Sequence, residues 1–170
     1  MIIRPATPAD HASISRIVLP VIRAGETYAL DRGMSEEAAL AYWCGADRFT
    51  SVAQAHDGAI LGTYYLRQNQ QGGGAHVANC GYMTAPDATG KGIARTMCLH
   101  SLSEARRRGF RAMQFNFVVS SNTRAVGLWK SLGFAEVGCL PLAFDHPLLG
   151  FVDALVMFRT LEMEPAPGTA

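Results

Sequence analysis

Residues 86–94 have the composition and spacing of a phosphate-binding turn at the start of a helix. Gly90 and Gly92, with the short side chain of Thr89 before them, let the backbone approach an anion closely. The first N–H groups of a helix lack partners within the helix, so they point at such an anion. An ordinary glycine-containing turn between a strand and a helix is the alternative, because short glycine motifs also occur by chance.

The segment after this turn predicts a helix. Gly109 stands where a C′ glycine would end it. Six apolar residues recur at helical spacings before that point: Ile93, Ala94, Met97, Cys98, Leu102 and Ala105.

Residues 112–134 predict a buried strand followed by a second helix. Residues 112–119 alternate in a way that is typical of a strand with both faces mostly covered. Four apolar side chains then share one face of a helix that Gly133 ends: Ala125, Leu128, Trp129 and Leu132. The order is therefore strand, glycine-rich turn, helix, strand, helix and strand.

These segments resemble the GNAT superfamily of acyl-CoA-dependent N-acetyltransferases. Residues 89–94 are similar to its (Arg/Gln)-x-x-Gly-x-(Gly/Ala) pyrophosphate loop, and residues 122–134 to its Asn-x-x-Ala-x-x-Leu-Tyr-x-x-x-Gly-Phe segment. Thr89 replaces the usual Arg or Gln, and Trp129 replaces the usual Tyr. The resemblance covers nearly the whole chain and implies a single-domain α/β GNAT fold with a mixed, splayed β-sheet flanked by helices.

A narrower similarity points to the branch that includes N-acetyltransferases of proline analogues such as azetidine-2-carboxylate. It is carried by residues 79–83, 115–122 and 152–157. Many uncharacterised members share these segments, and a few pocket residues set specificity within a fold.

The resemblance implies acetyl-CoA as the cosubstrate, with direct acetyl transfer through a tetrahedral intermediate. The backbone of residues 82–84 would pair with the pantetheine arm, and one of its N–H groups would polarise the acetyl carbonyl. Thr89 lacks the charge of the usual Arg, which predicts somewhat weaker coenzyme binding. The implied coenzyme-binding residues are Tyr82, Met83, Thr84, Thr89, Gly90, Lys91, Gly92, Ile93, Ala94, Asn122 and Trp129.

Two asparagines are the candidates for recognising the acceptor. Asn79 and Asn116 each interrupt an apolar strand, and a buried amide without a partner costs ~1–3 kcal/mol. They would hold the carboxylate or amine of an amino-acid-like acceptor, unless each is a hydrogen-bonded structural amide. Asn116 and Asn122 are the catalytic candidates, and an N-cap beside Ser121 is the alternative for Asn122.

The sequence offers no clear acid or base. Glu26 and Asp153 are candidates for the base or for substrate binding, although each has a surface or capping alternative and the amine can lose its proton to water. Tyr28 lies in the segment that forms much of the acceptor pocket in the superfamily. The indole N–H of Trp129 is too weak an acid to replace a Tyr hydroxyl, which favours a packing role.

Composition bounds the remaining possibilities. The chain has 170 residues, 49% hydrophobic content and a formal net charge of +1, which fits one globular domain, predicted as residues 1–163 with a flexible tail at 164–170. Interspersed charges argue against nucleic-acid or membrane-surface binding, and Arg106–Arg108 is interpreted as a solvated last helical turn. We expect a cytoplasmic protein without metal, compatible with a homodimer. Four separated cysteines are interpreted as buried free thiols: Cys44, Cys80, Cys98 and Cys139.

Several structural details are also predicted. Pro20 should kink or divide the first long helix, and Gly81 should form a bulge that splays its strand from the one at residues 111–119. A long loop over 141–150 should rim the acceptor site. The other expected elements are strands at 2–4, 50–55, 60–68, 75–84, 134–140 and 151–161, with helices after residue 7 and over 35–43.

The sequence therefore predicts an acetyl-CoA-dependent N-acetyltransferase of a small amine, which could be an amino acid or a proline-like analogue. A protein or peptide N-terminal acetyltransferase is one alternative, which acidic lining and an open groove would favour. A non-catalytic acyl-CoA-binding sensor is the other, suggested by Trp129 and the missing base.

Overall fold

The computed structural model describes residues 1–161, so the predicted tail at 164–170 lies outside the described residues. Their centre is one seven-stranded sheet in the order β1-β2-β3-β4-β5-β7-β6, in which only β4 and β5 pair in parallel. The strands are β1 (Ile2–Pro5), β2 (Arg48–Gln54), β3 (Ile60–Gln68), β4 (Val77–Thr84), β5 (Ala112–Val119), β6 (Ala135–His146) and β7 (Gly150–Thr160). The helices are α1 (His11–Ala24), α2 (Glu36–Trp43), α3 (Ile93–Arg107) and α4 (Thr123–Ser131).

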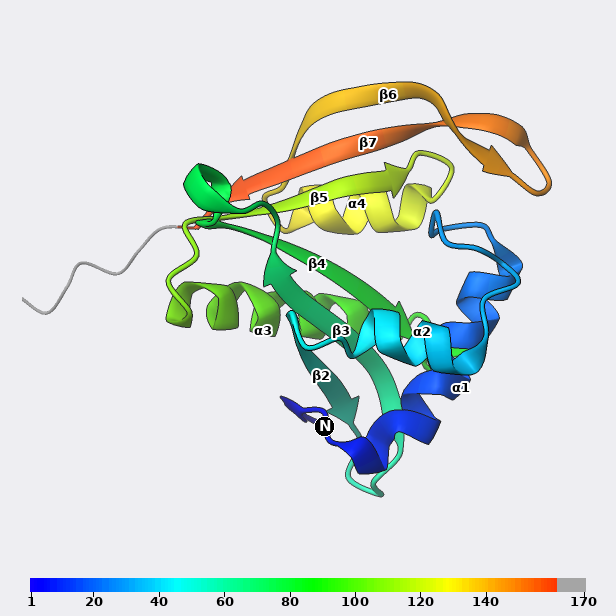
Figure 1. Cartoon of the computed structure of the whole chain (residues 1–170), viewed down its shortest axis with the longest axis vertical. Coiled ribbons are helices and arrows are strands. Elements are labelled where there is room, and N and C mark those ends of the chain that lie inside the picture. Colours follow the sequence, from blue (N-terminus) through cyan, green and yellow to red (C-terminus); the bar gives the residue numbers. More distant parts are fainter. Residues whose placement is uncertain (162–170) are drawn as a thin grey trace, which may run out of the picture.

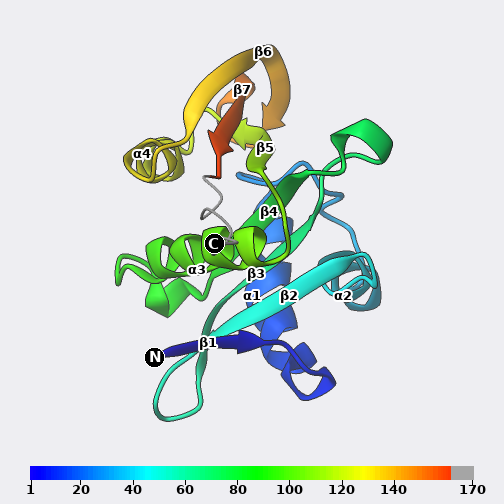
Figure 2. The same cartoon turned by 90° about the vertical axis from the view of Figure 1, so that its left-hand side faces the viewer.

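The helices cover both faces of this sheet. Helices α1 and α2 lie on one face of the β2–β4 part, and α3 lies on the other (Figures 1 and 2). Helix α4 lies beside β5 on the same side as α3, and the long β6–β7 pair arches over it. The predicted α/β class, the hairpin of β2 and β3 and the glycine at the end of α3 are confirmed.

Pro20 was predicted to kink or divide the first long helix; the division is wrong, because α1 continues through Pro20 from His11 to Ala24. Pro20 lies on the exposed side of the helix. Water can therefore satisfy the Arg16 carbonyl that loses its helical donor.

Strands β4 and β5 separate almost as soon as they pair. Their parallel ladder holds only Val77 opposite Ala112 and Ala78 opposite Met113. The predicted bulge at Gly81 is absent, because β4 stays in continuous register with β3 from Ala78 to Thr84. The irregularity lies instead in β5, between Phe115 and Val118, where that strand pairs with β7.

Residues 141–146 belong to β6, so the loop predicted over 141–150 was wrong. A register shift between Leu140 and Phe144 interrupts the β6–β7 ladder. Leu142 takes a positive φ of 51° there, and its N–H donates to Asp153 Oδ1 at 2.9 Å. The carboxylate of Asp153 thereby stabilises the irregular part of the edge strand.

The expectation for the cysteines changes with the fold, whereas Arg107 in the last turn of α3 is solvent-exposed as expected. Cys80 and Cys98 are buried, but Cys139 is exposed because its strand β6 lies at the edge of the sheet. Arg107 and Arg108 at the end of α3 both bind Glu104, at 2.7 and 2.6 Å. The described residues contain no helix long and apolar enough to cross a membrane.

Gly81 allows Tyr65 on the neighbouring strand to lie flat against β4. A Cβ atom at Gly81 would come within 2.7 Å of the Tyr65 ring. That ring is 4% exposed and packs edge-on against Trp43, with ring centroids 4.9 Å apart. The glycine is thus required by side-chain packing from β3.

We expect Gly81→Ala to lower the free energy of unfolding by about 1–3 kcal/mol, because the packed Tyr65 ring has little room to move. Gly127→Ala is the matched control, since a Cβ at this exposed position in α4 meets nothing within 4 Å. The control should leave stability unchanged or raise it by up to ~1 kcal/mol. Chemical denaturation of both variants measures the difference; equal stabilities would contradict the packing argument.

Candidate functional site

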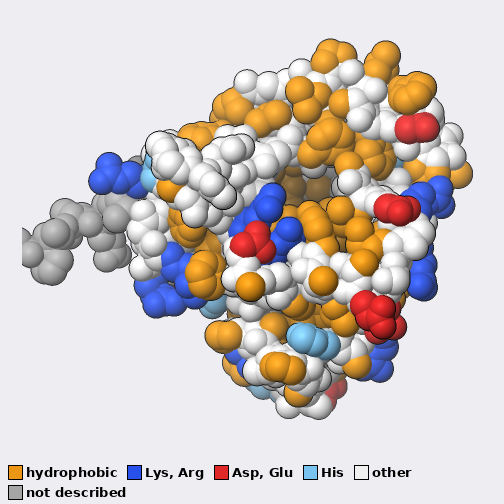
Figure 3. Space-filling view, viewed as in Figure 1, with side chains coloured by type: hydrophobic (Ala, Val, Ile, Leu, Met, Phe, Trp, Pro, Cys, Tyr) orange, Lys and Arg blue, Asp and Glu red, His pale blue; other side chains and the backbone are white. Residues whose placement is uncertain are grey.

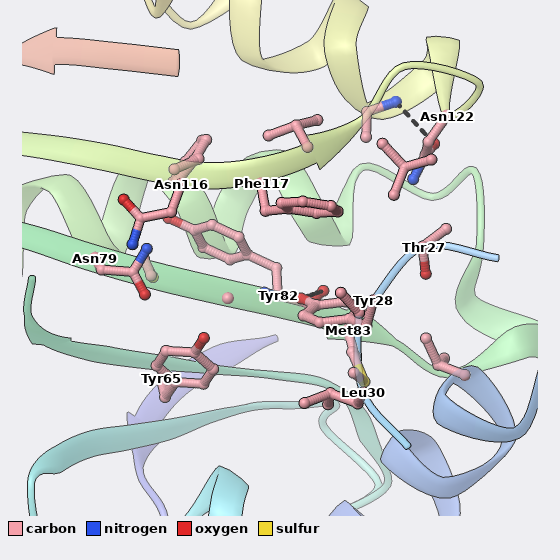
Figure 4. Close-up of a pocket in the computed structure, with 18 of the residues that line it drawn as sticks. Thr27, Tyr28, Leu30, Tyr65, Asn79, Tyr82, Met83, Asn116, Phe117 and Asn122 are labelled. Atoms are coloured by element: carbon pink, nitrogen blue, oxygen red, sulfur yellow. Dashed lines mark hydrogen bonds between the residues drawn. The ribbon is translucent and has the colours of Figure 1, made fainter. Parts of the chain in front are cut away.

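A cavity of about 570 Å³ fills the gap where β4 and β5 part. Its walls come from β3, β4, β5, α4 and the segment between α1 and α2 (Figure 4). The space-filling view shows the hollow between the β5–β7 part and the remainder of the molecule, with mostly hydrophobic walls (Figure 3). The cavity is of the size that holds small ligands in other proteins.

The backbone of Tyr82 faces this cavity. Ala85 N–H bonds Leu61 O and Asn69 N–H bonds Val77 O across the β3–β4 ladder. Because antiparallel pairs alternate, Tyr82 forms a pair without hydrogen bonds to β3 and directs its N–H and C=O away from β3, toward the gap. By the same alternation Thr84 faces the gap, whereas the backbone of Met83 bonds β3.

The hydroxyl of Tyr28 binds both backbone groups of Tyr82. It accepts from Tyr82 N–H and donates to Tyr82 C=O, each at 2.9 Å. Burial raises the pKa of the Tyr28 hydroxyl, so it stays protonated and can make both bonds. Tyr28, which was predicted to bind the acceptor, therefore binds the backbone of β4, the strand that was predicted to pair with the coenzyme.

Trp129 is part of the cavity wall. It is 8% exposed, and its ring centroid lies 5.1 Å from those of Tyr82 and Phe115. The Tyr82 hydroxyl is 2.6 Å from Ser101 Oγ of α3. These contacts support packing as the role of Trp129, and they show that the side chains of Tyr82 and Phe115 face α3 and α4.

Asn79 and Asn116 lie on the opposite face and point toward one another across the gap (Figure 4). Asn79 Nδ2 donates to the backbone oxygen of Gln114 at 3.0 Å, which links β4 to β5. Asn116 Nδ2 donates to Asn69 Oδ1 at 2.7 Å, and Asn116 Oδ1 accepts from the Gln114 side chain at 2.8 Å. Both asparagines are hydrogen-bonded structural amides that also line the cavity.

Asn122 also caps a helix and lines the cavity at the same time. Its side-chain oxygen accepts from Ala125 N–H at 3.2 Å, so it is the N-cap of α4, which was the structural alternative. It lines the cavity as well.

The glycine turn before α3 has a geometry that fits an anion. Gly90 and Gly92 take positive φ values of 84° and 78°, and α3 begins at Ile93. A Cβ at Gly90 would lie 3.4 Å from Arg124 Nη2, which places a guanidinium beside the turn. Thr89 lines the cavity, so the turn adjoins the gap between the strands.

Two of the predicted acceptor-site residues do not line the cavity. Glu26 is exposed and does not line the cavity, and Asp153 binds the edge strand β6 instead. Their neighbours in sequence gave no sign of this, because the direction of each side chain depends on how its segment packs. The described lining residues consequently include no carboxylate.

The prediction also missed two lining residues on β3, Tyr65 and Arg67. Arg67 lies directly opposite Asn79 in the β3–β4 register, and Tyr65 lies opposite Gly81. Both residues could have been predicted from the alternation of side chains along β3, since they share a face with Asn79. That inference requires the register between β3 and β4, which the sequence does not give.

Residues 22–134 match the model of the acetyltransferase (GNAT) family. The chain belongs to the GNAT family. A GCN5-related N-acetyltransferase from Kribbella flavida shares 43% sequence identity and a TM-score of 0.89, covering 94% of this chain and 97% of that one. The predicted GNAT fold is thereby confirmed, with its mixed sheet and flanking helices.

Two other relatives extend the comparison. The protein yncA from Salmonella typhimurium, solved with its cofactor acetyl-CoA, shares the fold at 24% identity and a TM-score of 0.83, covering 100% of this chain and 99% of that one. N-acetyltransferase aca1 from Schizosaccharomyces pombe is 33% identical over 101 residues, which are 58% of this chain and 47% of that protein. The chain thus spans about half the length of this curated relative.

Gly92→Ala and Gly109→Ala separate backbone strain from anion binding. Both glycines have positive φ with nothing within 4 Å of a Cβ, but Gly109 lies at the other end of α3. Each variant should lose about 1–2 kcal/mol of stability, because L-residues are strained in this conformation. Calorimetric titration with coenzyme A should show at least about tenfold weaker binding for Gly92→Ala alone. An equal change of coenzyme affinity in both variants would exclude the turn as an anion site.

Proposed function

We propose that this chain transfers the acetyl group of acetyl-CoA to the amine of a small acceptor. The observation that carries the proposal is the gap between β4 and β5, where the backbone groups of Tyr82 face a cavity that adjoins the glycine turn of α3. Family membership supports the same reaction class.

Acetyl-CoA combines a pyrophosphate, an extended arm with amides and a reactive thioester. The N–H groups of residues 90–94 would hold the pyrophosphate, helped by the α3 dipole. Arg124 would add a positive charge there, which compensates for Thr89. The backbone of Tyr82 and Thr84 would bind the arm as a neighbouring strand does, with Asn122 beside it and Met83 contributing its side chain.

The Tyr82 N–H is the donor that this proposal assigns to the acetyl carbonyl. A fixed backbone N–H stabilises negative charge that develops on such an oxygen, and it does so more strongly in a cavity than in water. Since the Tyr28 hydroxyl binds this N–H, it must yield the N–H when the carbonyl is bound.

The lining favours a small acceptor without a protein base. No described lining residue has a carboxylate, so the amine would lose its proton to water before the reaction. Asn79 and Asn116 would orient the acceptor, an amino acid or a proline-like analogue, as the predicted branch implies. A peptide N-terminal acetyltransferase is less favoured, because the acidic lining expected of it is missing among the described residues.

A sensor that binds acyl-CoA without turnover is the second candidate. Trp129 in the wall, where the family usually has a Tyr, and the missing carboxylate favour it.

A cytoplasmic location and a homodimeric assembly stay predictions.

Turnover is tested by release of free coenzyme A thiol from acetyl-CoA with amino acids, proline analogues, polyamines and short peptides as acceptors. We expect release with amino-acid-like acceptors and a loss of at least about tenfold in kcat/KM for Asn116→Ala, since one hydrogen bond to a charged acceptor is worth ~1.5–3 kcal/mol. Asn69→Ala is the control: it removes the hydrogen-bond partner of Asn116 but does not line the cavity. Coenzyme binding with no release from any acceptor would favour the sensor.

Tyr28→Phe tests the position of the acetyl carbonyl. Without coenzyme, the variant should lose about 1–3 kcal/mol of stability, because the Tyr82 N–H and C=O lose their shared partner. With acetyl-CoA the loss should shrink and the affinity for acetyl-CoA should rise, because the ligand occupies the N–H. Thermal unfolding with and without acetyl-CoA measures both effects.

Tyr64→Phe is the control for this variant. Tyr64 lies directly opposite Tyr82 in the β3–β4 register, but its hydroxyl binds His100 Nδ1 at 2.8 Å on the α3 face, away from the predicted contact. Its stability loss should be the same with and without acetyl-CoA. An identical loss for Tyr28→Phe in both states would place the acetyl carbonyl elsewhere.

A further inference from the structure

We propose that Arg67 binds a carboxylate of the acceptor, and that the acceptor is therefore a small amine that also carries a carboxylate group. Arg67 is the one charged side chain among the described residues that line the cavity. The inference rests on the proposed function and names the substrate class that the same site selects.

Arg67 lies on the acceptor side of the sheet. It is directly opposite Asn79 and two residues from Tyr65, so all three side chains share one face, with Trp43 of α2 packed on Tyr65. Asn116 of β5 contributes to the same face, since it faces away from the α3 and α4 side where Phe115 packs. The arginine is thus grouped with the two amides that line the cavity.

The guanidinium of Arg67 is only loosely held by the protein. Its Nε lies 3.5 Å from Asn79 Oδ1, and its Nη1 lies 3.8 Å from Asp47 Oδ2, both at the long limit for such contacts. The side chain of Asp47 is 63% exposed, so water screens this pair. The Arg67 side chain is 31% exposed, and most of its five N–H donors are free to bind a ligand.

A carboxylate is the ligand that this arrangement suits. The planar fork of arginine binds a carboxylate through two parallel N–H···O bonds, and such charge-assisted bonds are stronger than neutral ones. A polyamine would instead bring a second positive charge beside Arg67, with no described lining carboxylate to neutralise it. The cavity therefore selects for a carboxylate and against additional cations.

The test compares each amino acid of the panel with its primary amide, for example L-proline with L-prolinamide, because the amide lacks the carboxylate. Rates are compared at equal concentrations of unprotonated amine, since the amide is the weaker base. For Arg67→Gln, kcat/KM for the acid should fall about 10- to 100-fold, as expected for loss of a hydrogen-bonded charge partner. Its kcat/KM for the amide and its KM for acetyl-CoA should change less than about twofold. Arg67→Lys should keep part of the preference, because it retains the charge but loses the fork.

Arg107→Gln is the matched control, since Arg107 binds Glu104 on the surface of α3 and does not line the cavity. It should leave the ratio of acid to amide unchanged. Melting temperatures of all variants identify any that fold poorly. A wild-type enzyme that uses amide and acid equally well, or an Arg67→Gln variant that keeps the preference for the acid, would overturn the inference.

Absence of thiol release with every acceptor would contradict the proposed function without deciding the role of Arg67. In that case calorimetry measures binding of N-acetyl-L-proline and of N-acetyl-L-prolinamide in the presence of coenzyme A. Binding of the acid to wild type, weakened at least about tenfold by Arg67→Gln, supports the inference. No binding of the acid, or equal binding to both proteins, overturns it.

Discussion

The site depends on one interruption of strand pairing. Two adjacent parallel strands normally satisfy each other's backbone groups along their whole length, but β4 and β5 do so only at their first two pairs. Beyond Ala78, the N–H and C=O groups that face β5 must find other partners, since unpaired buried groups are costly. In this protein the Tyr28 hydroxyl serves Tyr82, and the Asn79 amide reaches across to the Gln114 backbone.

This interruption explains why the two sides of the cavity differ. The side chains of Tyr82 and Phe115 pack with Trp129 on the side of α3 and α4, which makes this side of the cavity aromatic. The other side carries three polar side chains, of which Asn79 is buried and Asn116 and Arg67 are partly exposed. Alternation along the same strands provides both environments, which the proposed coenzyme arm and small polar acceptor would use.

Electrostatics give the cavity its character. With one arginine and no carboxylate among the described lining residues, the cavity favours negatively charged ligands. At the glycine turn, the α3 dipole and the Arg124 guanidinium add positive potential beside Thr89, where the family usually has Arg or Gln. Arg124 of α4 therefore supplies a positive charge beside the turn, where the sequence comparison at Thr89 had indicated that one was missing.

The sequence by itself determined the order of elements, the glycine turn and the family, because these depend on local periodicity, on glycines at positive φ and on short motifs. Its candidates Asn79, Asn116, Tyr28 and Asn122 all line the cavity. Only the tertiary structure decided which strand carries the irregularity, that residues 141–146 form a strand, and that Asp153 serves an edge strand. Arg67 likewise emerged only from the register of β3 against β4, since pairing between strands sets which distant side chains share a face.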